Sequence, residues 1–519
     1  MKQRYLDLLS TLLQYLLLGG AILYLVVYIV IACKRMNYPY ELDWMEGAFV
    51  DHVKRILAGK QLYVEPSLEF TPYFYTPLYF YISAGVAKIL GIGFLPLRLV
   101  SFVSSIGCFG LIFQFVRRET KSIFCAILSA GFYAATFKIS GTWFDLARLD
   151  SLFLFFVLAS IYLLRFRRDA RAIVFAALLM FLAFLTKQSG LLIALSLSVY
   201  GFLVYDRWSR FLFPVTFLLM LGISTAILNW ISDGWYYYYV FDLPTQHRIV
   251  KSMIWGFWRY DILVPLAIAL GLSLAFLIYQ FSKDKTDGFI FFALLFIGMI
   301  GSSWLSRMHS GSWVNVLFPA YAAMALFFGL GLQGLLSEHL YFSAAPQLQS
   351  SRDENNPVLE RKFTGLFFLI ISIFQFLLLL YKPTAYIPTR ADAEAGDAFV
   401  RLLKDIKGEL FISYPGFLPT LAGKSYYSDG GAIGDIFRGK DEELKTKLKA
   451  NIIEAVRSKQ FQTIITSSQC FGFFINSPSF VEEIKKHYVD KGPIFEDQTV
   501  FFHVTGGRVR PGRLFVLQD

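Results

Sequence analysis

Cysteine and charge are both scarce in this sequence. Only four of its 519 residues are cysteines, without a CxxC pair or other paired spacing, so no metal-binding or redox motif is indicated. Charged residues make up 17% of the chain, against about a quarter in a typical soluble protein. A nucleotide-binding motif is also missing, because the Gly-rich stretch at 426–435 lacks a strand–GxGxxG–helix context. A soluble nucleotide-dependent or disulfide-rich protein is therefore not expected.

Apolar residues dominate instead. The chain is 56% hydrophobic and 18% aromatic, with a mean hydropathy of +0.52, which is typical of a polytopic membrane protein. The first apolar run has no A-x-A site and is interpreted as an uncleaved anchor. Runs long enough to cross roughly 30 Å of hydrocarbon predict about eleven transmembrane helices, near residues 8–32, 96–116, 122–139, 150–166, 172–187, 189–205, 210–230, 260–281, 288–305, 313–336 and 364–381.

The basic loops predict the orientation of the chain. If residues 76–90 form a helix lying at the outer interface rather than a span, every strongly basic short loop falls on one side, as the positive-inside rule prefers. We therefore expect the N-terminus in the cytoplasm and the C-terminus on the outer side of the plasma membrane. The net charge of +11 is then explained by loop arginines and lysines. The expected outer segments are 33–95, 141–150, 187–190, 231–259 and 306–313.

The composition changes after residue 382. Helix-like runs at 393–406 and 441–459 alternate with the strand candidates "ELFISY", "TIITSS", "TVFFHV" and "RLFVLQ". This predicts a transmembrane domain at 1–382 and an extracytoplasmic α/β domain at 383–519. Residues 426–435 are expected to form a turn or loop facing the membrane domain, and 344–362 a polar cytoplasmic loop.

Four carboxylates crowd the stretch "YELDWMEGAFVDHV" after the first apolar run. Asp43 and Glu46 are three residues apart, so they are expected to share one face of a helical turn. Such a pair at the outer interface can deprotonate a hydroxyl or orient a cation. Glu41 and Asp51 are interpreted as parts of a solvated loop.

The same region resembles a known family. "ELDWMEG", "ILAGKQLY" and "FYTPLYFYI" are similar to the first outer loop of the GT-C superfamily of membrane glycosyltransferases, in the bacterial branch of aminoarabinose transferases and protein O-mannosyltransferase relatives. "PLRLVSFV" with Arg98, "FDLARLDSLFLFF", "FLTKQSGL" and "RMHSGSWVNVLFPAYA" extend the resemblance over about 320 residues. It implies a GT-C fold and a polyprenyl-phosphate-linked sugar donor. The family often has adjacent Asp-Glu, whereas here Asp43 and Glu46 are separated, so which one is the base stays open.

The chemistry of such a transfer assigns roles to the outer residues. A lipid phosphate is already a competent leaving group, whereas an attacking hydroxyl needs a base, so one carboxylate suffices for an inverting displacement. Asp43 is the first candidate and Glu46 the second, while Asp150 or Asp145 holds the acceptor or orients the base. The departing phosphate needs cations and donors, for which the candidates are Lys187, Arg148, Arg248, Arg307 and His309.

Each of these residues has a simpler alternative. Lys187 can be a snorkelling lysine, His309 a structural residue, and Arg148 the partner of Asp145 or Asp150 in a fixed ion pair. No spacing of potential ligands requires a metal ion. Carboxylates and His309 are expected on the same face, however, so the binding of a divalent cation stays an open alternative. The expected partners are the lipid-linked donor, a lipid, glycan or protein acceptor and membrane lipids, with no nucleic acid.

Two rival functions remain. A flippase or transporter of lipid-linked sugars would tend to keep ionisable residues within its spans, but the middles of the predicted spans contain none. A polysaccharide ligase would use a diphosphate-linked donor and outer arginines. The paired carboxylates favour the monophosphate-dependent glycosyltransferase.

Overall fold

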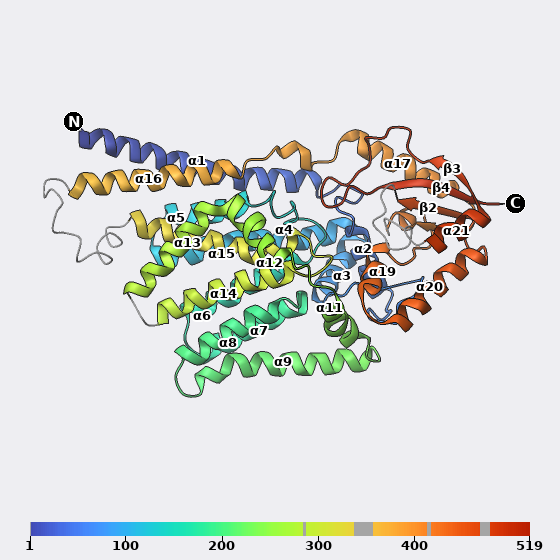
Figure 1. Cartoon of the computed structure of the whole chain (residues 1–519), viewed down its shortest axis with the longest axis horizontal. Helices are drawn as coiled ribbons and strands as arrows, with labels where there is room; N and C mark the ends of the chain where they lie inside the picture. Colours follow the sequence, from blue (N-terminus) through green and yellow to red (C-terminus); the bar gives the residue numbers. More distant parts are fainter. Residues whose placement is uncertain (1, 284–286, 337–356, 413–416, 468–477, 519) are drawn as a thin grey trace.

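The computed structural model describes residues 2–283, 287–336, 357–412, 417–467 and 478–518. A bundle of helices forms one end of the molecule and a small sheet with its own helices forms the other (Figure 1). The predicted polar loop at 344–362 lies largely outside the described residues. The elements of the helical part are α1 (Lys2–Arg35), α2 (Glu46–Leu57), α3 (Leu78–Leu90), α4 (Phe94–Thr120), α5 (Ile123–Ala135), α6 (Asp150–Phe166), α7 (Ala170–Thr186), α8 (Gly190–Val204), α9 (Ser209–Ile231), α10 (Trp235–Tyr237), η1 (Tyr238–Asp242), α11 (Leu243–Gln246), α12 (Met253–Gly256), η2 (Phe257–Leu263), α13 (Val264–Lys283), α14 (Asp287–Arg307), η3 (Val314–Leu317), α15 (Phe318–Leu336) and α16 (Pro357–Leu378).

The predicted class of a polytopic helical membrane protein is confirmed, but with fewer full-length spans. Six described helices are long and apolar enough to cross a membrane, or seven if the bent pair at 362–405 forms one span. Four predicted spans, at 122–139, 150–166, 172–187 and 189–205, are helices of 13 to 17 residues. At 1.5 Å per residue these reach only about 20–26 Å, short of a typical hydrocarbon core. Helices α6 and α7 have about the predicted length, whereas α5 and α8 are shorter than predicted; α5 ends early because a loop begins at residue 136 inside the apolar run.

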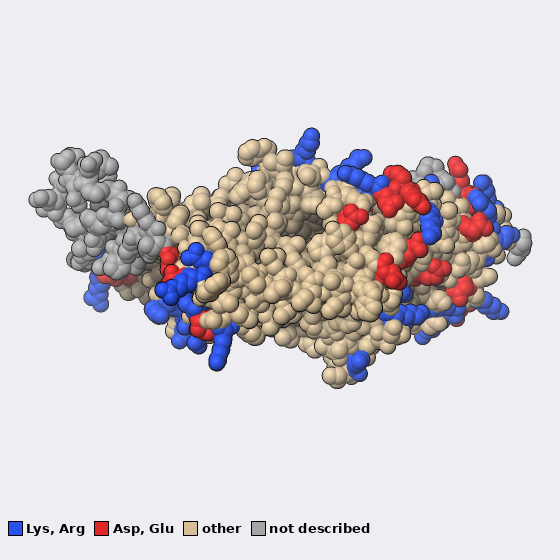
Figure 2. All heavy atoms as spheres, turned by 90° about the horizontal axis from the view of Figure 1, so that it is seen from below, with Lys and Arg blue, Asp and Glu red and all other residues tan. Residues whose placement is uncertain are grey.

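The helices divide into a buried centre and an apolar outer layer. Helix α15 is buried along most of its length. Helix α9 leaves large apolar side chains exposed, among them Leu218, Ile223 and Trp230. Figure 2 shows that the middle of one face is almost free of charged side chains, which gather toward its two ends. Such an uncharged belt suits a hydrocarbon environment, where helices satisfy their own backbone hydrogen bonds.

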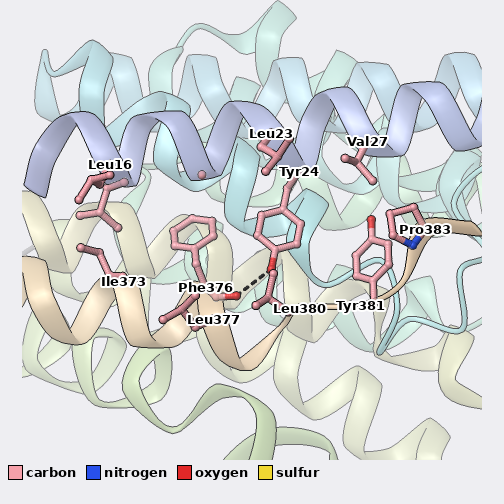
Figure 3. Close-up of a pocket in the computed structure, with 12 residues that line it drawn as sticks. Leu16, Leu23, Tyr24, Val27, Ile373, Phe376, Leu377, Leu380, Tyr381 and Pro383 are labelled. Atoms are coloured by element: carbon pink, nitrogen blue, oxygen red, sulfur yellow. Dashed lines mark hydrogen bonds between the residues drawn. The ribbon is translucent and has the colours of Figure 1, made fainter.

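Helices α1 and α16 lie side by side although they are far apart in the sequence (Figure 1). The Tyr24 hydroxyl of α1 donates a hydrogen bond to the Phe376 carbonyl of α16 at 2.8 Å. Around it an apolar crevice of about 350 Å³ opens between the two helices (Figure 3). Leu16, Leu23 and Ile373 belong to its wall.

The C-terminal part contains a four-stranded mixed sheet of order β1-β2-β4-β3, in which β1 and β2 are parallel and β4 is antiparallel to both its neighbours. The register pairs Leu410 with Thr463, and Ile464 with Phe515. The elements are η5 (Pro383–Tyr386), α17 (Arg390–Asp405), β1 (Leu410–Ile412), α18 (Leu418–Leu421), α19 (Gly430–Arg438), α20 (Glu442–Arg457), β2 (Thr463–Ser467), α21 (Pro478–His487), β3 (Tyr488–Pro493) and β4 (Pro511–Leu517).

Three of the four predicted strands are confirmed, as are the helices at 393–406 and 441–459. "TVFFHV" is not a strand, because Phe501 turns into the left-handed region with φ 60° and buries its ring. Strand β3 was not predicted, since four of its six residues are exposed at the sheet edge and its apolar and polar residues do not alternate. The expected turn at 426–435 contains the start of helix α19, whose first turn is capped by Asp429 accepting from the Gly431 N–H at 2.7 Å.

The sheet-containing part is fastened to the helical part through polar contacts. Tyr73 donates to Asp429 at 2.6 Å, and the Ser428 N–H donates to the Leu68 carbonyl at 2.8 Å. A single buried apolar cluster also runs through both parts. The division at residues 382/383 stays a prediction.

Candidate active site

The site lies where helix ends of the bundle meet the C-terminal part. Helix α1 ends at Arg35, α2 begins at Glu46, α6 begins at Asp150, and Lys187 follows the last residue of α7. The loops next to these helix ends carry further buried charges, among them Asp43, Asp145 and Arg148. Arg35, Glu46 and Asp150 lie at helix ends and Lys187 directly beyond one, so the ends of these helices bring the charges of the site together.

A chain of buried ion pairs joins four of the predicted site residues. Arg148 Nη1 is 2.6 Å from Asp43 Oδ2, and its Nε is 3.6 Å from Asp150 Oδ2. Asp150 Oδ1 accepts from Lys187 Nζ at 2.6 Å and from Asn315 Nδ2 at 3.0 Å. All four charged side chains are buried. Two acidic and two basic groups thus compensate each other away from water, as buried charges require.

Glu46 belongs to a separate arrangement. Its oxygens accept from Arg98 Nε at 3.0 Å and Nη2 at 2.7 Å, and from the N–H groups of Leu42 and Ala147 at 2.7 Å each. Burial raises the pKa of Glu46, but Arg98 and the two backbone donors outweigh burial and leave the pKa below its ordinary value. The expectation that Asp43 and Glu46 share a helical face is wrong, since α2 begins only at Glu46 and the two carboxylates contact different arginines.

Asp145 is held by another arginine. Its oxygens accept from Arg35 Nε at 2.7 Å and Nη2 at 2.5 Å, and Arg35 Nη2 also donates to the Thr142 carbonyl at 2.5 Å. Arg148 therefore pairs with Asp150, one of its two expected partners, but not with Asp145. The Arg35–Asp145 pair ties the end of α1 to the loop at 141–150.

Asp43 differs from the other carboxylates in its environment. Its Oδ1 atom is buried and accepts no hydrogen bond from the described residues. Burial raises the pKa of Asp43 above its ordinary value, although Arg148 and His503 oppose this effect. A carboxylate with a raised pKa and one unengaged oxygen is better suited to accept a proton than one that is fully hydrogen-bonded, like Glu46.

A cavity of about 460 Å³ lies beside the ion-pair chain. This volume is within the usual range for small-molecule sites. Asp43 is not among the lining residues, but its neighbour Trp44 and its partner Arg148 are. The polar lining includes Arg148, Lys187, His247, His309, Asn315, Asp435 and Arg438, and the aromatic lining includes Trp44, Tyr73, Phe74, Tyr75, Phe241 and Trp313.

The remaining predicted cations are placed differently. His309 lines the cavity, as a donor-binding residue should. Arg307 does not line it and instead contacts Asp261 Oδ2 through Nε at 2.9 Å. Arg248 is exposed and is also absent from the cavity lining.

The sequence reasoning missed several buried residues of this region. Asp435 and Arg438 of α19 enter the cavity lining from the C-terminal part. Burial raises the pKa of Asp435 to about 7 against the opposing effect of Arg438. No local signal predicts this placement, because it depends on contacts between segments nearly two hundred residues apart. One such contact is the hydrogen bond that His247 Nε2 donates to the Asp435 carbonyl at 3.1 Å.

The interpretation of Glu41 and Asp51 as solvated is wrong. Both are buried, with exposed fractions of 6% and 4%. Burial raises the pKa of both carboxyl groups, to about 7 for Glu41. Among the described residues, no three or more His, Cys, Asp or Glu side chains are grouped so that they could hold a metal ion.

Comparisons with known proteins agree with the resemblance read from the sequence. Residues 74–232 match the family described as dolichyl-phosphate-mannose-protein mannosyltransferase, over less than half of the chain. No curated protein matches the chain.

Solved structures share the fold. ArnT from Cupriavidus metallidurans bound to undecaprenyl phosphate is 13% identical with a TM-score of 0.56, covering 96% of this chain and 98% of its own. Its apo state gives 13% identity and a TM-score of 0.58, covering 96% and 97%. The oligosaccharyltransferase of Archaeoglobus fulgidus tethered with an acceptor peptide is 11% identical with a TM-score of 0.52, covering 94% and 76%. The partial family match and the shared fold agree with the predicted resemblance to GT-C membrane glycosyltransferases.

Proposed function

We propose that this membrane glycosyltransferase moves one sugar from a polyprenyl-phosphate donor to a hydroxyl group of a lipid, glycan or protein, with Asp43 as the general base. The observation that carries the proposal is Asp43 itself, which has a raised pKa and an unengaged Oδ1, and whose neighbour Trp44 and partner Arg148 both line the cavity. Asp43 takes the acceptor proton, and the acceptor oxygen bonds to the anomeric carbon. The bond from that carbon to the phosphate oxygen breaks, and polyprenyl phosphate leaves.

The cavity offers groups for the leaving phosphate. Arg148 and Lys187 line it, and Asp150 holds both of them from behind. Preorganised cations of this kind stabilise charge that develops on a phosphate oxygen. His309 stays a candidate beside them, whereas Arg248 and Arg307 do not line the cavity. Because Asp43 is fully buried, the acceptor reaches it only when the lining beside it moves.

We also propose that the chain crosses the membrane about eleven times, with the short helices packed against longer neighbours and α3 lying at the outer interface. Ion pairs support a common side for the basic loops, since Arg165 contacts Glu119 at 2.5 Å and Arg168 contacts Asp287 at 3.0 Å. The first helix begins at the end of the molecule opposite the sheet (Figure 1). The positive-inside rule then puts the basic loops in the cytoplasm and the site and C-terminal part outside the plasma membrane.

A transfer assay tests the proposal. The protein in lipid is given a panel of radiolabelled polyprenyl-phosphate sugars and a membrane extract with candidate acceptors. We expect label in an acceptor, and a loss of about 10²–10⁴-fold in rate for Asp43→Asn, the usual contribution of a general base. Asp242→Asn, at an exposed carboxylate, serves as the matched control. Unchanged transfer by Asp43→Asn would remove the base assignment, and donor crossing the bilayer without transfer would favour a flippase.

A further inference from the structure

A loop of the C-terminal part, residues 503–507, reaches into the candidate site. The Thr505 N–H donates to the Leu42 carbonyl at 3.2 Å. The Thr505 hydroxyl donates to the Gly141 carbonyl. These two contacts fasten the backbone of the segment that carries Asp43 to the backbone of the segment that carries Arg148. The loop therefore joins the two halves of the central ion pair.

Gly506 covers Asp43 at close range. A Cβ atom at this position would lie 2.1 Å from Asp43 Oδ1 and 3.1 Å from Trp44 Cδ1. Gly506 also has φ +69°, a region that glycine adopts without steric cost. Only glycine lets the loop lie this close while Asp43 remains 2.6 Å from Arg148.

His503 anchors the other side of the same segment. Its Nε2 donates to Glu41 Oε2 at 3.2 Å, and its Nδ1 donates to the Gly507 carbonyl at 3.3 Å. With both ring nitrogens donating, the contacts fit the charged imidazolium. Glu41 Oε1 accepts in turn from the Gly47 N–H at 2.9 Å, in the first turn of α2. His503, Glu41 and Gly47 thus bracket residues 42–46.

The electrostatics agree with this geometry. Burial lowers the pKa of His503, but the nearby Glu41 and Asp43 carboxylates outweigh burial and leave the pKa raised. Removing His503 would leave a buried Glu41 oxygen without its donor, and an unsatisfied buried polar group is destabilising. Rearrangement of residues 41–43 is the way to relieve that cost.

We propose that His503 is a positioning residue, which acts through Glu41 to hold Asp43 on Arg148 in the geometry needed for sugar transfer. This inference rests on the proposed function and adds to it a part for the C-terminal loop in the reaction. His503 does not line the cavity, so its effect is expected on the rate of the bound complex rather than on donor binding.

The test compares His503→Leu with His503→Gln in the full chain. Leucine removes the donor to Glu41, whereas glutamine keeps one. We expect His503→Leu to lower kcat about 10–100-fold, since a displacement near 1 Å can cost about 100-fold, with the KM for the lipid-linked donor within threefold. His503→Gln is expected to recover most of kcat. His487, which is 3.4 Å from Glu483 on α21, provides the matched control pair as His487→Leu and His487→Gln.

Hydrogen exchange of the peptide at 40–50 gives a readout that does not need activity. Faster exchange in His503→Leu than in His503→Gln, with no change in the His487 variants, supports the positioning role. The positioning role would be overturned if His503→Leu kept the wild-type kcat and the wild-type exchange rate. Equal losses of kcat in His503→Leu and His503→Gln would overturn it as well. If His503→Leu fails to fold, Gly506→Ala replaces it, and a wild-type kcat there also overturns the proposal. A wild-type protein that transfers no sugar would refute the proposed function instead, and exchange still decides whether His503 holds residues 41–47.

Discussion

Glu46→Gln separates a structural carboxylate from a catalytic one. In the structure both oxygens of Glu46 are engaged, by two nitrogens of Arg98 and by two backbone N–H groups. Glutamine retains one oxygen that can accept hydrogen bonds. Its NH₂ group takes the place of the other oxygen and faces N–H groups, which are themselves donors. The buried Arg98 guanidinium, 1% exposed, loses its counter-charge.

Breaking a buried ion pair by neutralising one partner costs about 3–5 kcal/mol. We therefore expect Glu46→Gln to lower the thermal unfolding temperature by several degrees. Asp43→Asn should lower it less, because Arg148 keeps Asp150 as a counter-charge and Asp43 Oδ1 accepts no hydrogen bond from the described residues. The measurement is thermal unfolding of both variants in detergent, followed by tryptophan fluorescence, with transfer assayed in parallel below the transition.

The two variants should therefore lose different properties of the protein. Asp43→Asn loses transfer in a folded protein, and Glu46→Gln loses stability, with activity falling only as far as the fold does. A Glu46→Gln protein with the wild-type unfolding temperature and no transfer would refute this reasoning and make Glu46 the base.

Two further predictions concern the cavity. Lys187→Met should raise the KM for the lipid-linked donor about 10–100-fold, since a hydrogen bond to a charged group contributes about 1.5–3 kcal/mol, and an unchanged KM in a donor titration would contradict a phosphate role. Asp435→Asn should stabilise the protein relative to wild type more at pH 8 than at pH 5.5. The folded pKa of Asp435, about 7, is above that of an unfolded aspartate, so its contribution is present at low pH and lost as the pH rises through 7. Unfolding temperatures of the two proteins across this range check the sign, and a difference that stays constant with pH would contradict the burial of Asp435.

Local sequence patterns predicted the fold class and most of the secondary structure. The apolar runs located the helices of the bundle, and short β-branched and aromatic runs located β1, β2 and β4. The length of α5 was overestimated, because hydropathy does not register where a loop begins inside an apolar run. Strand β3 could not be predicted, since an exposed edge strand lacks the alternation that marks a half-buried one.

The candidate site was predictable where a charge follows an apolar helix. Lys187 follows α7, and Arg148 and Asp150 stand just before and at the start of α6; these three come together with Asp43 from the loop after α1. Their pairing was not predictable, because Asp43 and Arg148 are joined across 105 residues. His503 was hidden for the same reason, as it meets Glu41 only after the C-terminal part has packed against the bundle.

The pairing of α1 with α16 bears on the order in which the protein is made. The Tyr24 hydroxyl finds its acceptor on a residue that is synthesised 352 positions later. Until the ribosome has delivered α16 to the bilayer, one side of α1 faces lipid and its tyrosine lacks that partner. Closure of the bundle is therefore a late event of biogenesis. Substitutions in the crevice between these two helices should reduce the yield of assembled protein before they alter the rate of any molecule that has assembled.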